Sequence, residues 1–509
     1  SLPFDKPDVH AKNIRLRKIE LHDPLVYVKK DTNKTFNFSF LMQTPKTNDS
    51  LRWHIGCSHF VYRNGMLIFR EEHVPDPVWF NLSNMNFSLE AFRAGPSRDI
   101  SFQLKRLHFQ SHDGFHLKNF SMQAQVRDGE YVLSNLQAST QYSGLLIDTV
   151  YFDSRPLREK NSWTRCPLRL DIKKFDFNFQ DIAFILPDYA SEGISVSLNG
   201  CLQGSVDALR GKGLTARIGD VTRATTDLYV NGLPDLENAY IFLNVYQSYA
   251  NLNKIRDLQL PEKLKFVTEK MPSFMKNIGE FSYEGNFTGF LNDFVAYGNA
   301  YSDLGSLRCD ISFKPSVLGV LKIGGSVQTR KLHFGKIFNQ KRLGILTMSG
   351  KINGTVYNNQ YDIDYDGTID QIEINGYPFR NASLNGNLQN KLFNGELTIL
   401  DPNLQGFYSG KLDLSGELPY FGFVSEVNYA DLRKLNLTED SLSRISFRVD
   451  ANFLGNNIDN LRGNLMLDQL AYVNQKDTLF LDHAIITSTF GSDSSGFEVQ
   501  SHWIDGQIS

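Results

Sequence analysis

The C-terminal half of the chain repeats a short segment in which apolar and polar residues alternate and which ends in glycine. Residues 281–285, 372–376 and 412–416 are examples. Because successive side chains of a strand point to opposite faces, this alternation predicts strands with one apolar and one polar face. The glycines are expected at turns, at β-bulges or where two backbones approach closely.

Changes in this pattern divide the chain into three regions. Residues 1–245 alternate less regularly, and turn signals such as Asp113-Gly114 separate the apolar runs. Residues 246–278 lack a period of two, and Pro261 suits the first turn of a helix. We therefore expect two short helices there, and the strand–glycine pattern resumes over residues 279–509. The apolar residues that recur at helical spacing are Leu264, Phe266, Val267, Met271 and Phe274.

The pattern predicts an all-β fold: an elongated, curled antiparallel β-sheet, shaped as a U-like groove, with one short helical insertion. At about 12–20 residues per strand the chain holds roughly 25–40 strands. A flat sheet of that size would twist and expose its apolar face. The spacing is too irregular for a sandwich of discrete domains or for a parallel solenoid.

Composition narrows the function. A formal net charge of −3 and a pI near 6.4 argue against a nucleic-acid surface. No apolar stretch approaches the roughly 20 residues that span a bilayer, and no signal peptide is visible. Since the pattern is cut off at both ends, we expect a piece of a longer protein whose anchor lies outside this sequence.

Motifs of catalysis and cofactor binding are missing, so we expect neither an enzyme nor a cofactor. The four cysteines are widely spaced and are interpreted as unpaired small hydrophobes, although three pairings are open. Three histidines recur every four residues, but Asp113-Gly114 between them indicates a hairpin with solvated or packed histidines. The cysteines are Cys57, Cys166, Cys201 and Cys309, and the histidines are His108, His112 and His116.

One segment matches the calcium-loop pattern D-x-D-x-D-G-x₅-E. That loop lies between two helices, whereas residues 357–361 and 374–379 read as strand and turn. In a strand the alternating aspartates form the polar face, so we expect no metal site. The candidate calcium ligands would be Asp362, Asp364, Asp366, Asp370 and Glu373.

Several segments, taken in their order along the chain, resemble the TamB/AsmA-like proteins of Gram-negative bacteria, most closely the long Bacteroides-type members. The resemblance is best from about residue 190 onward. The segments are Gly193-Ile-Ser-Val-Ser-Leu-Asn-Gly200, Gly232-Leu-Pro-Asp-Leu-Glu-Asn-Ala-Tyr240, Gly285-Asn-Phe-Thr-Gly289, Gly298-Asn-Ala-Tyr-Ser-Asp-Leu-Gly305, Tyr365-Asp-Gly-Thr-Ile-Asp370, Leu392-Phe-Asn-Gly-Glu-Leu397, Asp401-Pro-Asn-Leu404 and Tyr429-Ala-Asp-Leu-Arg-Lys-Leu-Asn-Leu437.

The resemblance implies a middle segment of a periplasmic β-groove (a β-taco) in the cell envelope, between an inner-membrane anchor and a region that meets an outer-membrane barrel protein of the TamA kind. Residues 1–245 would be AsmA-like and residues 279–509 TamB-like. The groove would shield phospholipid acyl chains in transit. The alternative is a scaffold or chaperone that offers open sheet edges during outer-membrane protein assembly.

A lipid groove needs a row of apolar side chains, each buried methylene stabilising a bound chain by about 0.8 kcal/mol. The same face could instead pack against itself as a dry core, and the sequence leaves both open. One bulge would reverse the facing of all later residues in a strand. Leu414→Asp or Phe447→Asp is expected to block acyl passage. The candidate groove lining is Phe281, Tyr283, Phe287, Leu321, Ile323, Val327, Ile372, Ile374, Leu384, Leu388, Leu412, Leu414, Phe421, Phe423, Ile445, Phe447 and Val449.

Overall fold

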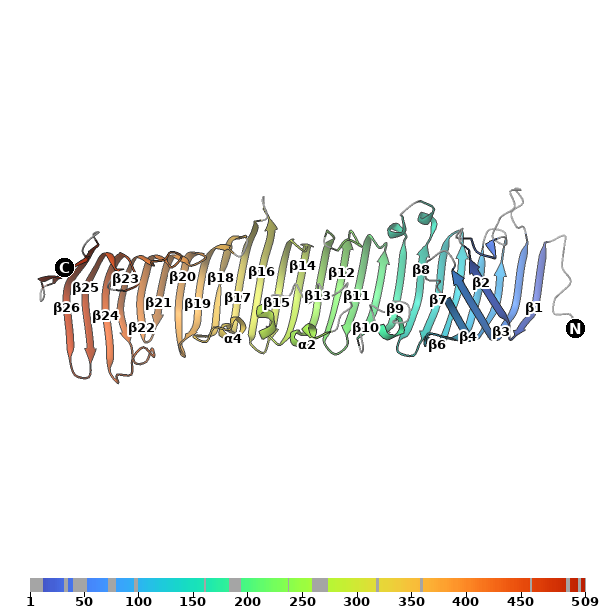
Figure 1. The fold of residues 1–509 in the computed structure, drawn as a ribbon, viewed down its shortest axis with the longest axis horizontal. Coiled ribbons are helices and arrows are strands. Elements are labelled where there is room, and N and C mark those ends of the chain that lie inside the picture. The colour runs from blue at the N-terminus through green and yellow to red at the C-terminus, as the bar shows by residue number, and fades with distance from the viewer. Residues whose placement is uncertain are drawn as a thin grey trace. The chain divides into compact units, whose positions relative to one another are not determined.

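In a computed structural model of the protein the chain divides into two units, Ser1–Met271 and Pro272–Ser509, each of which is described by itself (Figure 1). The fold is mostly β, with 74% strand and 6% helix. The structure describes residues 12–31, 35–39, 53–71, 79–95, 99–159, 162–182, 194–236, 238–258, 273–316, 320–357, 360–457, 460–490, 495–501 and 505–508.

The N-terminal unit is a sheet in which each strand from β3 to β13 pairs antiparallel with the next along the chain. β1 and β2 both pair in parallel with the same edge of β3. The strands are β1 Asn13–His22, β2 Leu25–Lys30, β3 His54–Glu71, β4 Trp79–Ala94, β5 Ile100–Ser111, β6 His116–Arg127, β7 Glu130–Ser139, β8 Gly144–Asp153, β9 Leu168–Asn178, β10 Ser195–Gly204, β11 Ala208–Ile218, β12 Thr222–Asn231 and β13 Tyr240–Asn251; the helices are η1 Arg155–Arg158, η2 Trp163–Arg165, η3 Phe179–Ile182 and α2 Leu252–Arg256.

The C-terminal unit continues the same design, with every strand from β14 to β28 antiparallel to its neighbour in sequence. Its elements are η6 Ser273–Asn277, β14 Glu280–Phe290, β15 Asp293–Ser302, β16 Gly305–Pro315, β17 Leu321–His333, α4 Phe334–Phe338, β18 Leu343–Tyr357, β19 Gln360–Ile374, β20 Tyr377–Gln389, β21 Leu392–Asp401, β22 Leu404–Asp413, β23 Tyr420–Asp431, β24 Ser443–Leu454, β25 Arg462–Asn474, β26 Thr478–Phe490, β27 Ser495–Ser501 and β28 Asp505–Ile508.

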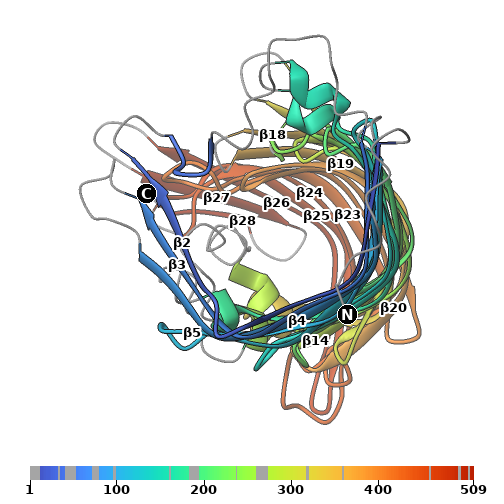
Figure 2. The same ribbon diagram turned by 90° about the vertical axis from the view of Figure 1, so that its right-hand side faces the viewer.

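Each sheet curls around a hollow and does not close on itself (Figure 2). In the C-terminal unit β-bulges bend the strands along one line that crosses them. The pairing register shifts between Thr329 and Leu332, between Val427 and Ala430, and at other strands on the same line. Lys331 of β17 has a φ of 49°, the left-handed conformation that such a bulge requires.

These observations confirm the predicted fold class, an unclosed, curled antiparallel sheet with few helices. The expected helical segment differs in detail. Residues 246–251 continue β13, because their backbone pairs with β12. Helix α2 follows directly, whereas Pro261 and most of the predicted second helix lie outside the described residues.

Candidate apolar binding trough

A row of uncharged side chains crosses the C-terminal unit, strand after strand, from β14 to β27. Directly paired residues lie on the same face of an antiparallel sheet, so the pairing register identifies the members. The row consists of Phe287, Ala296, Ile311, Gly325, Ile352, Tyr365, Gly386, Gly395, Gly410, Phe423, Ala451, Leu465, Ile486 and Val499.

Two more rows flank the first on the same face, and they are equally free of charge. Aromatic rings stack between neighbouring strands in the outer row, with centroids 4.9 Å apart for Phe294 and Phe313 and 4.7 Å apart for Phe421 and Phe453. One row runs from Gly285 through Cys309, Val327, Leu384, Leu397, Tyr408 and Val449 to Ala484, and the other from Gly289 through Phe313, Ile323, Leu388, Phe393, Leu412 and Phe421 to Gly463.

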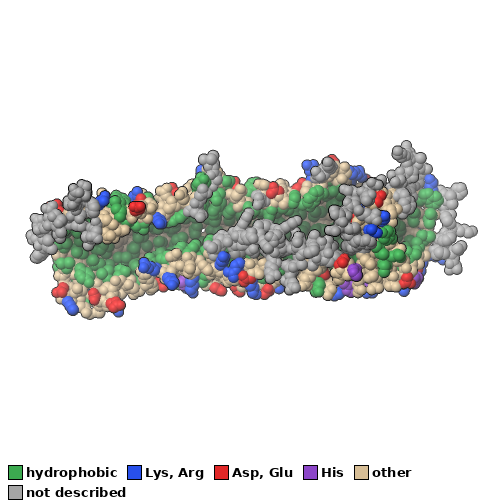
Figure 3. All heavy atoms as spheres, in the orientation of Figure 1, with side chains coloured by type: hydrophobic (Ala, Val, Ile, Leu, Met, Phe, Trp, Pro, Cys, Tyr) green, Lys and Arg blue, Asp and Glu red, His purple; other side chains and the backbone are tan. Residues whose placement is uncertain are grey.

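The opposite face of this sheet is mostly polar, although apolar residues such as Val295 and Phe407 lie exposed on it. Glu284, Lys322 and Asp364 alternate with the apolar residues and are exposed. Hydrophobic side chains gather in the hollow, and charged side chains lie along its borders (Figure 3). We call the hollow apolar face of each unit its trough.

No second layer of strands covers the C-terminal trough within the described residues, and most of its lining is only half-buried. Leu388 keeps 43% of its surface exposed. The chain exposes 31896 Å² in all, whereas two compact proteins of half its mass would together expose about 23,000 Å². An apolar face of this size that no described strand covers is a surface on which apolar ligands can be desolvated.

Of the glycines that end the repeated segment, Gly285 lies within β14, whereas Gly376 lies in the turn between β19 and β20 and Gly416 in the bend after β22.

Glycines within the strands let aromatic rings lie flat on the trough floor. The ring of Tyr365 covers the paired Gly350 and Gly367: a Cβ on Gly350 would lie 2.7 Å from ring atoms. Its hydroxyl donates to the carbonyl of Ser349 at 3.3 Å. Burial is the main cause that raises the pKa of Tyr365, so the phenol stays protonated and donates this bond.

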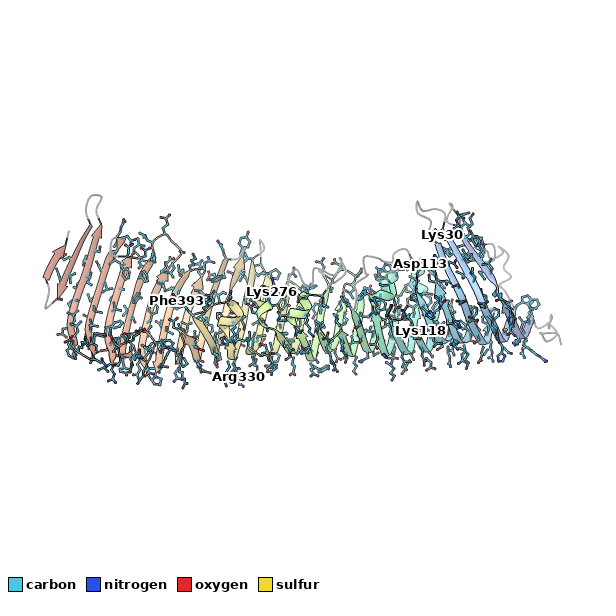
Figure 4. All side chains as sticks on the ribbon, turned by 60° about the horizontal axis from the view of Figure 1, so that its bottom comes forward. Lys30, Asp113, Lys118, Lys276, Arg330 and Phe393 are labelled. Atoms are coloured by element: carbon cyan, nitrogen blue, oxygen red, sulfur yellow. The ribbon has the colours of Figure 1, made fainter. Side chains whose placement is uncertain are left out.

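The same arrangement recurs at other places along the trough. Tyr283 covers Gly285 and Gly298, and its hydroxyl donates to the Tyr297 carbonyl at 3.1 Å. Phe393 likewise lies against a glycine pair, whereas Arg330 projects away from the outer face of the sheet (Figure 4). The rings therefore form a low, apolar floor whose polar atoms are turned toward the backbone.

Helix α4 is the described helix that packs onto the trough floor of the C-terminal unit. Phe334 contacts the buried cluster of Leu346, Ile369 and Ala382. The Phe338 ring lies tilted against the Phe334 ring, with centroids 4.4 Å apart, and Phe338 is 43% exposed. α4 contacts both β18 and η6, so the two helices lie together over the trough floor at β18.

The N-terminal unit has a trough of the same kind. Its central row pairs apolar residues from β5 to β13: Phe102, Ala124, Leu133, Val150, Leu170, Leu202, Gly211, Leu228 and Leu243. Leu136, Ile147 and Ile172 form a buried cluster on this floor. The sequence interpretation gave this half no lining residues because its alternation is broken by more bulges.

The structure places the predicted lining residues as follows. All except Leu414 lie within strands of the C-terminal unit, and Leu414 follows the end of β22 with 46% of its surface exposed. Ile372 and Ile374 lie beyond the bulge line, where they pair with Leu346 and Leu343. Because the bulge shifts the alternation, apolar residues face the trough on both sides of that line.

The calcium-like segment is part of the uninterrupted strand β19. Asp362 and Asp364 are exposed, and both accept a hydrogen bond from the Asn387 side-chain amide, at 2.6 and 2.9 Å. Asp366 and Asp370 are exposed too, whereas Glu373 is half-buried. Among the described residues, no group of acidic, histidine or cysteine side chains is arranged to hold a metal ion.

The histidine and cysteine candidates have the following surroundings. Asp113-Gly114 forms the predicted hairpin turn between β5 and β6. Burial, with Arg106 and His116 nearby, lowers the pKa of His108. The four cysteines, all described, are unpaired, and burial raises the pKa of Cys166.

Sequence reasoning missed α4 and the bulge line. Leu332 and Phe334 alternate like strand residues. The helical spacing of Phe334, Ile337 and Phe338 covers only the five residues of α4, too short a run to separate it from the strand pattern. Lys331 gives no sign of a left-handed conformation, which is more common for glycine and asparagine.

Comparisons with protein-family models, with curated proteins and with solved structures found no match to this chain. Among the described residues, no helix has both the length and the apolar character needed to cross a membrane.

Proposed function

We propose that the chain binds phospholipid acyl chains along its troughs and carries them through the periplasm between the inner and outer membranes, without a catalytic step. The observation that carries this proposal is the uninterrupted row from Phe287 to Val499. Its members lack charge and lie on one face, and all of them except the buried Ala451 stay partly exposed. At the usual strand spacing β14–β28 extend for about 70 Å.

A trough of this kind suits lipids because it contacts only hydrocarbon. Each methylene removed from water contributes about 0.8 kcal/mol, while the head group can remain in solvent at the open side. The resemblance to TamB/AsmA-like proteins supports a periplasmic location, an anchored full-length protein and an outer-membrane barrel partner of the TamA kind.

Lipid that co-purifies with the protein tests the proposal directly. The protein is extracted with organic solvent, and phospholipid per chain is measured by mass spectrometry. Phe423→Asp places a carboxylate in the trough and is expected to remove most bound lipid. Phe407→Asp is the matched control, because Phe407 lies on the outer face one strand away and is 39% exposed. Equal lipid in the two variants, or a folded wild type free of lipid, would contradict the proposal.

The scaffold alternative draws on a different observation. β1 lies at an edge of the N-terminal sheet. On the neighbouring β2, Leu25 and Tyr27 are 64% and 43% exposed. However, Asn37 already donates hydrogen bonds to the Lys29 and Tyr27 carbonyls, each at 2.9 Å, so the edge that stays available among these described strands is that of β1. An edge strand of this kind can accept a further strand. Under this alternative Phe423→Asp leaves assembly of outer-membrane barrel proteins unchanged. Under the lipid proposal the same variant loses most of its bound lipid.

A further inference from the structure

A separate pocket lies at the rim of the N-terminal trough. It has a volume of about 730 Å³, within the roughly 300–1,000 Å³ typical of small-molecule sites. Its floor is the last row of apolar residues before the strands end. That row contains Ile55, Ala94, Ile100, Val126 and Tyr131, which pair directly from β3 to β7.

The pocket is covered by η1, which the structure fixes firmly in place. The Arg155 guanidinium donates to both carboxylate oxygens of Asp153, at 2.6 to 3.1 Å, and to Glu130 at 2.7 Å. The backbone amide and the hydroxyl of Ser154 donate to the Gly129 carbonyl at 2.8 and 2.9 Å. These bonds hold η1 at the turn between β6 and β7, above the strand ends.

Helix η1 presents the apolar side chain of Leu157 to the pocket. Its Arg158 forms a charged pair with Asp128 of the β6–β7 turn at the pocket opening. Leu157 lines the pocket, yet half of its surface is exposed, and Trp53 lies on another wall. At the opening the Arg158 guanidinium lies 3.5 Å from the Asp128 carboxylate, and both are well exposed. An amphiphile with a hydrocarbon chain and a polar end matches this distribution.

We propose that the rim pocket binds one acyl chain of a lipid, with the polar end of the lipid at the Asp128–Arg158 opening. The inference rests on the proposed function, because the pocket floor adjoins the central row of the trough. Tyr131 lies two residues from Leu133, and Val126 two residues from Ala124, on the same face. A chain in the pocket therefore contacts the same apolar surface as lipid in the trough.

Trp53 provides a local reporter. In a full-length variant that keeps Trp53 while Trp79, Trp163 and Trp503 are changed to phenylalanine, dibromostearate is expected to quench the fluorescence saturably. A protein that keeps only Trp163 is the control, because Trp163 lies on η2 and is absent from the pocket lining. Vesicles of dibrominated phosphatidylcholine, added in a second series, assign the chain to phospholipid if they quench and to free fatty acid if only dibromostearate does.

Leu157→Asp in the Trp53 protein is expected to weaken binding of the quencher about tenfold or more, since it replaces a half-exposed leucine that a bound acyl chain would cover. Leu236→Asp, an exposed leucine outside the pocket lining, should change nothing. Unquenched Trp53, or equal quenching with Leu157→Asp, overturns the rim site. If the rim site fails in this way but Phe423→Asp still loses its lipid, the trough proposal stands without the rim site. If Trp53 is quenched but Phe423→Asp keeps its lipid, the trough proposal fails.

Discussion

Single glycines determine how far aromatic side chains project from the trough floor. A residue with a Cβ at Gly350 would meet the ring of Tyr365 and nothing closer. Glycine thus allows the ring to lie flat, and the hydroxyl to reach the Ser349 carbonyl. Filling the space under the ring should lift it into the trough.

Gly350→Ala is expected to destabilise the protein by about 1–3 kcal/mol, the usual cost of overpacking. In a Tyr365→Ala background the same change should be neutral or slightly stabilising, since alanine loses less chain entropy than glycine on folding. Urea unfolding of the four proteins gives the coupling free energy. Gly144→Ala, where an added Cβ meets nothing within 4 Å, is the control. A coupling energy near zero would contradict the role assigned to Tyr365.

At the scale of elements, bulges decide which residues face the trough. The alternation in the sequence predicted strands and their two faces, because it reports directly on the pleat. It could not place the bulge after Thr329, since Lys331 resembles any exposed strand residue. The helix α4 was also missed, because contacts of Phe334 with residues distant in sequence stabilise it rather than its local propensity.

Lys331 tests the bulge. Lys331→Gly should stabilise the protein by up to about 1 kcal/mol, because a left-handed conformation costs a residue with a Cβ roughly that much. Deletion of Lys331 should destabilise it strongly, because Leu332 and the start of α4 would lose their facing. Urea unfolding measures both variants. If the deletion is tolerated, the bulge does not set the facing of β17.

The η1 cover should loosen in acid. The hydrogen bond from Arg155 is the main cause that lowers the pKa of Asp153. A lowered pKa in the folded state means that the ionised carboxylate stabilises the fold. That contribution is complete above the carboxyl pKa of the unfolded chain and disappears as the pH falls through the lower, folded-state pKa.

Hydrogen exchange of residues 154–158 measured against pH reports this loosening. Protection in the wild type should fall in acid below the usual carboxyl range, whereas Asp153→Asn should show low protection that varies little with pH. Asp148→Asn, an exposed aspartate of β8 that pairs with Lys173, controls for general acid effects. An Asp153→Asn protein with the wild-type pH profile would contradict the role of the Asp153–Arg155 pair.

At the scale of the whole molecule, each unit is a series of strands that contact chiefly their neighbours in sequence. Stability in such an arrangement is nearly a sum of local terms, as in repeat proteins. Binding capacity should then also be distributed along the trough rather than concentrated at one site.

Ending the chain at Asn474 tests this view. The truncation removes β26, β27 and β28, three of the fifteen described strands of the C-terminal unit, while β25 keeps its partner β24. We expect the remaining strands to stay folded by far-ultraviolet circular dichroism, and bound lipid per chain to fall modestly, because lipid bound elsewhere along both troughs is retained. In the full chain Ile486→Asp, in the trough row, should reproduce part of that loss, whereas Ile485→Asp on the other face should not. Complete loss of lipid on truncation would mean one discrete site, and no loss would mean that the trough at β26 holds none.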